Sequence, residues 1–139
     1  MLIGKGIGEG YAMAESIHHR WTDIEPEPLN ALITRQYVVG TNVMLARIML
    51  KKGAQVPMHH HFHEQISHVV EGALSFTIDG KGVAMRAGEI LTIPPNVPHQ
   101  VIALEDSVVL DIFNPPRQDW IDGNDAYLRG ATENVQTEK

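Results

Sequence analysis

The sequence predicts an all-β domain, an antiparallel sandwich or barrel, and three observations lead to this prediction. Short runs rich in Val, Ile, Leu and Thr recur from Ala31 onward, and Gly, Pro and Asp separate them every few residues. Asp79-Gly80 stands between two of these runs and is typical of a hairpin turn, because glycine tolerates the positive φ that such a turn requires. The 139 residues, 43% hydrophobic and 20% charged, suffice for a single domain with its own core.

The elements follow in order along three parts of the chain. Residues 1–30 are predicted to be an irregular N-terminal arm, which begins with four alternate glycines (Gly4 to Gly10) and ends in Glu25-Pro26-Glu27-Pro28. The glycine spacing does not fit the GxGxxG pattern of a dinucleotide site. Residues 31–117 are predicted to form the barrel, with strands over Leu32–Val39, Asn42–Leu50, Ile66–Glu71, Leu74–Ile78, Gly82–Met85, Ile90–Ile93, His99–Leu104 and Val108–Phe113.

The last strand is predicted to end at Asn114-Pro115-Pro116, because proline has no N–H to donate to a ladder. Residues 118–139 are predicted to be a C-terminal extension. Within it, Asp119–Arg129 is expected to form a short helix broken near Gly123, and Ala131–Lys139 a polar tail.

Composition excludes several classes of function. The sequence has no cysteine, so disulfides, thiolate metal sites and cysteine nucleophiles are excluded. A net charge of −6 gives no basic footprint for nucleic acid or an anionic membrane surface. No apolar run approaches the ~20 residues that span a bilayer, and the first residues do not resemble a signal peptide.

We therefore expect a soluble, cytoplasmic protein with no nucleic-acid or membrane partner. A homodimer is expected, because the sheet edges of a small barrel are often covered by a neighbour.

Histidines are the main chemical feature, since five of the eight lie between His59 and His68. On an extended chain His59 and His61 face the same side and can bind one ion, while His60 faces away. His99 opens a later strand after a proline-rich turn and can join them if the two strands are neighbours. Imidazoles without thiolates predict one divalent transition metal, with Ni, Zn, Mn and Fe not distinguished. The alternative is a surface histidine cluster that binds nothing.

Two stretches frame these histidines and resemble the conserved motifs of the cupin superfamily. Gly53–Gly72 reads G-x5-H-x-H-x3-Q-x6-G, and Gly88–His99 reads G-x5-P-x-N-x2-H. The resemblance implies a single-domain cupin jelly-roll barrel with one metal at its centre. The implied ligands are His59, His61, Gln65 and His99. Gln65 replaces the glutamate common in the family, and Glu64 remains the alternative fourth ligand. Asn96 also departs from the family, which commonly has glycine at that position.

The segment Asp111–Asp119 reads D-x-F-x-P-x-R-x-D and resembles one cupin subgroup in particular. That subgroup acts in pectin degradation and converts unsaturated uronates to linear ketouronates. The resemblance implies that Asp111 and Phe113 face the pocket and that Arg117 lies at its mouth. Asp111 and Phe113 are two residues apart on the predicted strand and so share a face, which agrees with both of them facing the pocket. The alternative for Asp111 is an ion pair with Arg35 or Arg47. For Arg117 the alternative is a solvated surface position.

Two further residues, His63 and Arg35, are candidate pocket residues. The predicted function is a metal-dependent isomerase or lyase that opens and tautomerises an unsaturated uronic acid. In it the metal acts as a Lewis acid, Asp111 moves a proton and Arg117 binds the carboxylate of a small, carboxylated sugar. The alternatives are a cupin dioxygenase, a polyketide-cyclase-like enzyme on an aromatic or enol substrate, and a non-catalytic module that binds a small ligand.

Overall fold

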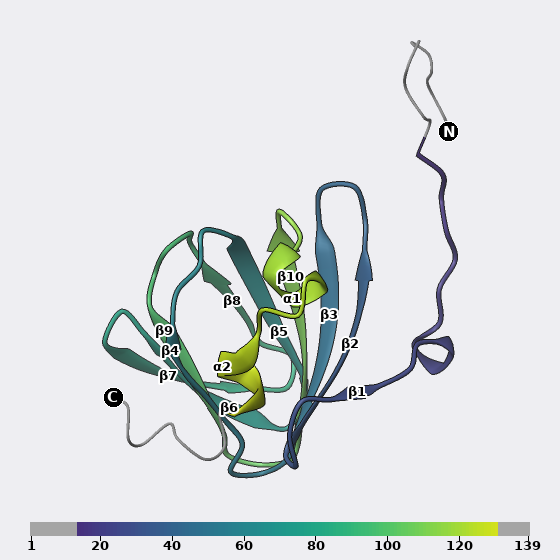
Figure 1. Ribbon diagram of the computed structural model, residues 1–139. Helices are drawn as coiled ribbons and strands as arrows, with labels where there is room; N and C mark the ends of the chain where they lie inside the picture. Colours follow the sequence, from purple (N-terminus) through teal and green to yellow (C-terminus); the bar gives the residue numbers. More distant parts are fainter. Residues whose placement is uncertain (1–13, 131–139) are drawn as a thin grey trace.

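A computed structural model of the chain describes residues 14–130. The predicted glycine-rich start and the predicted tail at residues 131–139 lie outside the described residues. Within them, two antiparallel sheets face each other, and the all-β jelly-roll prediction is confirmed (Figure 1). One sheet has six strands in the order β1-β2-β3-β10-β5-β8, and the other has four in the order β4-β9-β6-β7.

Ten strands make up these sheets in the described part of the chain. Their bounds are β1 Glu27–Pro28, β2 Ile33–Val39, β3 Met44–Leu50, β4 Gln55–His59, β5 Glu64–Glu71, β6 Ala73–Ile78, β7 Lys81–Arg86, β8 Ile90–Ile93, β9 His99–Ala103 and β10 Ser107–Asn114. Two of them, β1 and β4, are absent from the eight predicted strands. The β4 sequence Gln-Val-Pro-Met-His is poor in β-branched residues, and its pairing with β9 is irregular between Val56 and His59. A bulge of this kind is where a strand tolerates proline.

Strand alternation fixes what lies inside the barrel. On β3 the inward side chains Met44, Ala46, Ile48 and Leu50 are all buried. On β10 the same period of two brings Asp111 into the inward row between two buried apolar residues, Val109 and Phe113. An acidic side chain therefore enters the barrel interior as part of a regular strand.

The predicted Asp79-Gly80 turn is confirmed and connects β6 to β7. Asp79 has φ 49° and Gly80 has φ 83°, so both central residues are in the left-handed region that this hairpin turn requires. The turn also meets the histidine-bearing end of β9, because the Asp79 N–H donates to the Pro98 carbonyl over 2.9 Å. Residues near the turn thereby support the start of the strand that carries His99.

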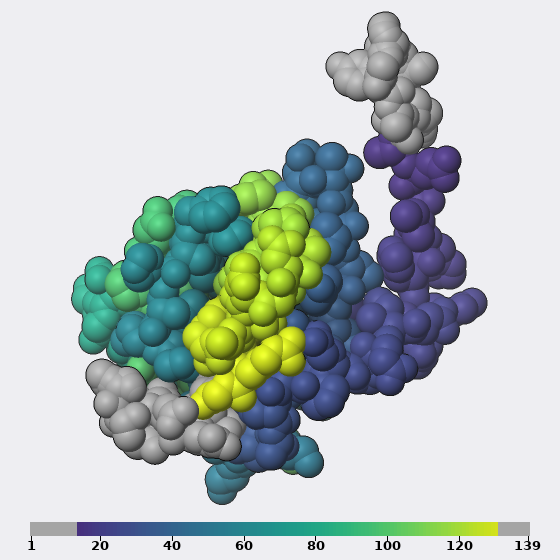
Figure 2. Space-filling view, in the orientation of Figure 1, coloured from purple at the N-terminus to yellow at the C-terminus, as the bar shows by residue number. Residues whose placement is uncertain are grey.

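The C-terminal segment forms two short helices, α1 (Gln118–Ile121) and α2 (Ala126–Arg129). The predicted helix and its break are confirmed, and Gly123 at the break has φ 78°. Figure 2 shows this yellow segment lying across the molecule between the teal and blue strands. No helix in residues 14–130 is long and apolar enough to cross a membrane.

An ion-pair network ties α2 to the beginning of the barrel. Asp125, which is 0% exposed, lies 2.9 Å from Arg35 and 2.9 Å from Arg129. Glu27 on β1 lies 2.9 Å from Arg35 and 2.6 Å from Arg129. Burial raises the pKa of Asp125, but the hydrogen bonds from Arg129 and Arg35 outweigh it and hold that pKa below its usual value. The residues preceding β1 are attached as well, because Gln36 donates to the Trp21 and Ile24 carbonyls.

Candidate metal centre and its cavity

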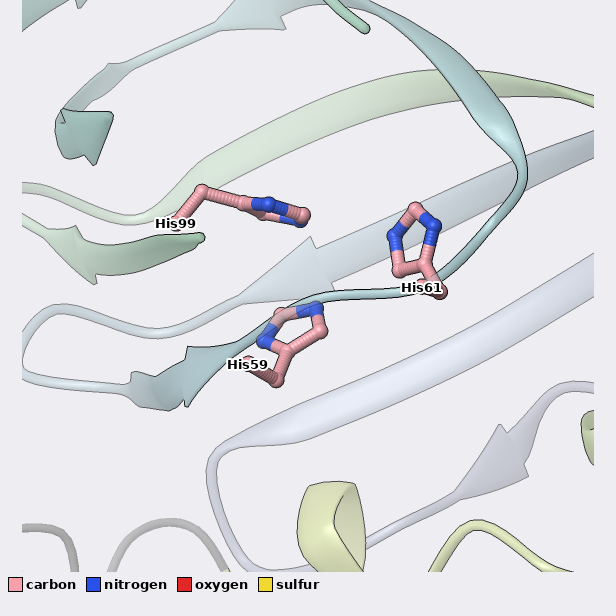
Figure 3. Close-up of side chains that lie close together, drawn as sticks. All are labelled: His59, His61 and His99. Carbon is pink, nitrogen blue, oxygen red and sulfur yellow. The ribbon is translucent and has the colours of Figure 1, made fainter. Parts of the chain in front are cut away.

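Three histidines converge at one end of the barrel. His59 ends β4, His61 follows in the loop before β5, and His99 begins β9 directly opposite His59 in the strand register. One ligand nitrogen from each lies within 4.8 Å of the others, a group that could hold a metal ion. Figure 3 shows the three rings turned toward one common space. The sheet pairing thus brings together residues 40 positions apart in sequence, as the sequence analysis predicts.

Backbone carbonyls orient the imidazoles. His59 Nδ1 lies 2.8 Å from the Pro57 carbonyl oxygen, and His99 Nδ1 lies 2.8 Å from the Val97 carbonyl oxygen. Because a carbonyl only accepts, Nδ1 carries the hydrogen in both rings and Nε2 keeps its lone pair. His99 Nε2 is buried and has no hydrogen-bond partner among the described residues. Such a fixed tautomer with a free lone pair is the arrangement that metal-binding histidines adopt.

Contacts of His61 also fit a bound cation. Its Nδ1 lies 3.1 Å from the His63 carbonyl oxygen, and its Nε2 lies 3.1 Å from Gln65 Oε1. A neutral imidazole has one N–H, so it satisfies only one of these two acceptors. If Nδ1 donates, Nε2 and the Gln65 oxygen are two electron-pair donors facing each other, and a metal ion that binds both would remove their repulsion.

The orientation of the Gln65 amide follows from a chain of hydrogen bonds. Gln65 Nε2 donates to Ser67 Oγ over 3.0 Å, and Ser67 Oγ donates to Asp111 Oδ1 over 2.6 Å. Since Ser67 has a single hydrogen and gives it to the carboxylate, it must accept from Gln65. This turns the Gln65 oxygen toward the histidines. The other candidate ligand, Glu64, is exposed on the opposite face of β5.

Burial keeps the histidines neutral. It lowers the pKa of His59 to about 3, with a further contribution from His99, and lowers the pKa of His61 to about 4. Burial also lowers the pKa of His99. Neutral imidazole is the form that binds a metal, so the site is ready for a cation across the physiological pH range.

These shifts predict a pH-dependent stability for protein freed of metal with a chelator. His59, His61 and His99 become protonated near pH 6.5 in the unfolded chain but not in the folded chain, so the free energy of unfolding should fall as the pH drops from 6.5 toward 4. The raised pKa of Asp111 makes its own contribution to stability increase as the pH falls below 6, but the four histidines with lowered pKa values, which include His63, act in the other direction.

Urea denaturation at a series of pH values measures this slope. His59→Gln should flatten it, whereas His60→Gln, at an exposed neighbouring position, should leave it unchanged. A slope that is equal in the wild type and in His59→Gln would contradict the prediction.

Asp111 combines burial with access to the cavity. Burial raises its pKa to about 6, and the hydrogen bonds from Ser67 and Gln65 limit the rise. Its partner is Ser67, whereas the paired residue on β3 is Ala46, so the alternative of an ion pair with Arg35 or Arg47 is not what the structure has. A carboxyl group with a pKa near neutrality can both take up and release a proton at that pH.

A cavity in the barrel interior reaches two of the three histidines, His59 and His99. Asp111, Phe113 and Arg117 also line it, and its empty space, which includes solvent at the mouth, is about 560 Å³. Arg117 is only 2% exposed, and its guanidinium packs against two neighbouring aromatic rings, 4.9 Å from that of Phe113 and 4.7 Å from that of Trp120. Arg117 is therefore part of the cavity wall, and the alternative of a solvated surface position does not hold.

Arg117 is also engaged by the C-terminal segment. Asp119 accepts from its Nε over 3.0 Å and from its Nη2 over 2.8 Å, and the Tyr127 hydroxyl accepts from Nη2 over 2.7 Å. Burial alone would lower the pKa of Arg117, but the Asp119 and Tyr127 contacts raise it, so the guanidinium stays charged.

Two predicted pocket residues lie outside the cavity wall. Arg35 is buried but turned toward Glu27 and Asp125, whose carboxylates hold its Nη2, and its guanidinium lies on the Trp120 ring. His63 is buried beside the cluster, with its ring stacked on Phe62 at 4.1 Å and facing the edge of His61. Their placement corrects the expectation that they line the pocket, because ion pairing holds one and aromatic packing holds the other.

Some residues of the site are not predicted from the sequence. Ser67 lies two residues after Gln65 on β5, so strand periodicity alone places it on the same inward face. Trp120 of α1 and Tyr127 of α2 complete the cavity wall, and Asp119 of α1 holds Arg117. No spacing rule links these residues to the histidines, because tertiary contacts alone bring the C-terminal segment over the barrel.

Comparisons with known proteins agree with this geometry. A family model described as a cupin domain matches residues 46–113. The pectin degradation protein KdgF of Dickeya dadantii (strain 3937) is 31% identical over 98 residues, 68% of this chain and 89% of the relative. The polyketide synthase CurC of Streptomyces cyaneus is 28% identical over 98 residues, 66% of this chain and 64% of the relative. The solved structure of KdgF from Halomonas sp. matches with a TM-score of 0.73 at 27% identity, covering 76% of this chain and 99% of the other.

Proposed function

The chain belongs to the cupin superfamily, and from this we propose that it is a metal-dependent enzyme that opens and tautomerises an unsaturated uronic acid. The observation that carries the proposal is a three-histidine cluster, two members of which line a cavity that is also lined by the Asp111 carboxyl group and the buried Arg117 guanidinium. The similarity to a pectin degradation protein supports the choice of a uronate as substrate.

His59, His61, His99 and Gln65 would hold the metal, whose identity among Ni, Zn, Mn and Fe is open. A divalent ion bound there supplies Lewis-acid polarisation of a substrate oxygen. Gln65 as the fourth ligand is neutral, so the full positive charge of the ion is available for this polarisation. The orphaned His99 Nε2 and the facing lone pairs of His61 and Gln65 are the features that fit such an ion.

Asp111 is proposed to move the proton. Ring opening breaks the bond between the anomeric carbon and the ring oxygen, and the anomeric hydroxyl gives up its hydrogen as the aldehyde forms. The enol that results becomes a ketone when a proton is added to the neighbouring carbon, C4. The reaction is therefore a balanced isomerisation that needs one group to accept and return a proton. The Asp111 carboxyl group suits this role because its pKa is about 6 and Ser67 holds one of its oxygens.

Anaerobic turnover of 4,5-unsaturated galacturonate, followed by the loss of its ultraviolet absorbance, tests the proposal. Native protein should turn over without O₂, while the Gln65→Ala and Asp111→Ala variants should be strongly impaired. Turnover that requires O₂ would favour a dioxygenase instead. Absence of turnover with a fully loaded metal site would remove the uronate assignment and favour the polyketide-cyclase-like or non-catalytic alternatives.

The homodimer stays a prediction. One surface suited to it is the outer face of the six-stranded sheet, where Leu45, Ile112 and Ile66 form a row across β3, β10 and β5, and Ile112 is 40% exposed. Associating subunits commonly bury apolar faces of this kind. Sedimentation equilibrium would measure a mass near 15.4 kDa for a monomer or twice that for the proposed dimer.

A further inference from the structure

Tyr127 occupies a notable position in the cavity wall. It belongs to α2, outside residues 46–113 that match the cupin family model. Its ring lies 4.9 Å from that of His59, and it lines the cavity together with Arg117 and Trp120. A side chain from the C-terminal segment is thus in contact with one of the candidate metal ligands.

Hydrogen bonds leave the Tyr127 hydroxyl with a free hydrogen. Its oxygen accepts from Arg117 Nη2 over 2.7 Å and from Trp120 Nε1 over 3.3 Å. Both partners are donors only, so together they use the two lone pairs of the oxygen. No residue in the described range 14–130 accepts the hydroxyl hydrogen. Apart from the residues that the structure does not describe, that hydrogen can therefore be given only to water or to a molecule in the cavity.

Arg117 offers a second free donor next to this hydroxyl. Asp119 accepts from Nε and from the Nη2 hydrogen on the same side of the guanidinium. The other Nη2 hydrogen, which Tyr127 accepts, therefore lies on the terminal edge of the guanidinium, next to Nη1. Nη1 has no hydrogen-bond partner among the described residues. The free hydrogens of Nη1 and of Tyr127 are consequently neighbours, and two neighbouring donors match the two oxygens of a carboxylate.

We propose that Tyr127 is a substrate-contacting residue whose hydroxyl donates to the substrate carboxylate beside Arg117 Nη1. The inference rests on the proposed function, since it takes the uronate as the substrate. Asp119 already occupies the Nε and Nη2 edge of the guanidinium, which could otherwise bind both oxygens of a carboxylate. Arg117 Nη1 therefore supplies one donor to the substrate carboxylate, and Tyr127 supplies the second. The ion pairs of Asp125 and Arg129 fix α2 and thereby hold this donor in place before substrate arrives.

Steady-state kinetics of Tyr127→Phe tests the inference. The variant removes a hydrogen bond to a charged group, so the KM for unsaturated galacturonate should rise by about 10- to 100-fold while kcat changes little. Tyr37→Phe is the matched control, because Tyr37 packs on the same Trp120 ring at 6.2 Å but does not line the cavity. The control should keep the wild-type KM. Metal content of both variants should match the wild type, whereas Tyr127→Phe should unfold at a lower temperature, because Arg117 Nη2 and Trp120 Nε1 lose their acceptor.

Replacing Tyr127 with 3-fluorotyrosine separates donation to substrate from support of Arg117. The more acidic phenol donates better and accepts worse, so KM should fall if Tyr127 donates to the substrate. Burial raises the pKa of Tyr127, which keeps the phenol protonated at neutral pH. A KM that rises would overturn the inference and leave Tyr127 as a support for Arg117.

The outcomes distinguish this inference from the proposed function. If wild-type protein turns over the uronate and Tyr127→Phe has the wild-type KM, the inference is overturned and the function stands. If wild-type protein turns over no unsaturated uronate, both are overturned.

Discussion

His99→Ala is expected to abolish stoichiometric metal binding and, with it, turnover. His99 contributes a buried Nε2 that has no hydrogen-bond partner within residues 14–130, and its Nδ1 is held by the Val97 carbonyl, so the Nε2 lone pair is preset for a metal ion. Residues that only support metal ligands typically change metal affinity by about 10- to 100-fold, and loss of a ligand should exceed this range. Titration calorimetry with Ni²⁺ and Zn²⁺, together with metal analysis of the purified protein, measures the change.

The matched control is His60→Ala, because His60 lies next to two of the candidate ligands but is exposed. It should bind metal like the wild type. His99 is itself buried, so the fold of the variant should be checked by far-ultraviolet circular dichroism, and His99→Asn serves as a second, more conservative change. Unaltered metal affinity in folded His99→Ala would remove His99 from the metal site.

Asp111→Asn is expected to lower kcat by about 100- to 10,000-fold, the range typical of general acid–base catalysis. The amide keeps the size of the side chain and can still accept the hydrogen bond from Ser67, but it cannot take up the proton. Because the wild-type carboxyl has a pKa of about 6, the acidic limb of the wild-type pH profile should lie near that value and should be absent from the residual activity of the variant.

Ser67→Ala provides the comparison for this variant. It removes the hydroxyl that contacts both Gln65 and Asp111 but leaves the carboxyl group in place, so its kcat should fall less than that of Asp111→Asn. An Asp111→Asn enzyme with near wild-type kcat and an unchanged pH profile would show that another group moves the proton.

Much of the barrel can be predicted from the sequence because it depends on local patterns. Strand alternation places Asp111 and Phe113 on one face, and the Asp79-Gly80 pair encodes its own turn. The histidine spacing likewise brings His59 and His61 together from one short segment. These features depend on residues that are neighbours along the chain, and so they can be read without knowledge of the tertiary structure.

Contacts made only in the folded structure are harder to predict. Arg35 has the charge expected of a carboxylate-binding residue, yet Asp125, 90 positions later, takes up that charge. Arg117 is found in the cavity wall, but its guanidinium edge is occupied by Asp119. In both cases the sequence shows which groups are present, whereas the choice of partner depends on how the C-terminal segment crosses the barrel.

The crossing of that segment has a consequence for engineering. A protein shortened to the strands around its metal motifs would retain all four candidate ligands but would lose Arg117, Trp120 and Tyr127 from the cavity wall. Under the proposed function, the metal ligands and part of the substrate contacts would therefore come from separable portions of the chain. Variation in residues 117–130 offers a route to new substrate preferences on an unaltered metal-binding barrel, provided that the Glu27 and Arg35 anchors of α2 are kept.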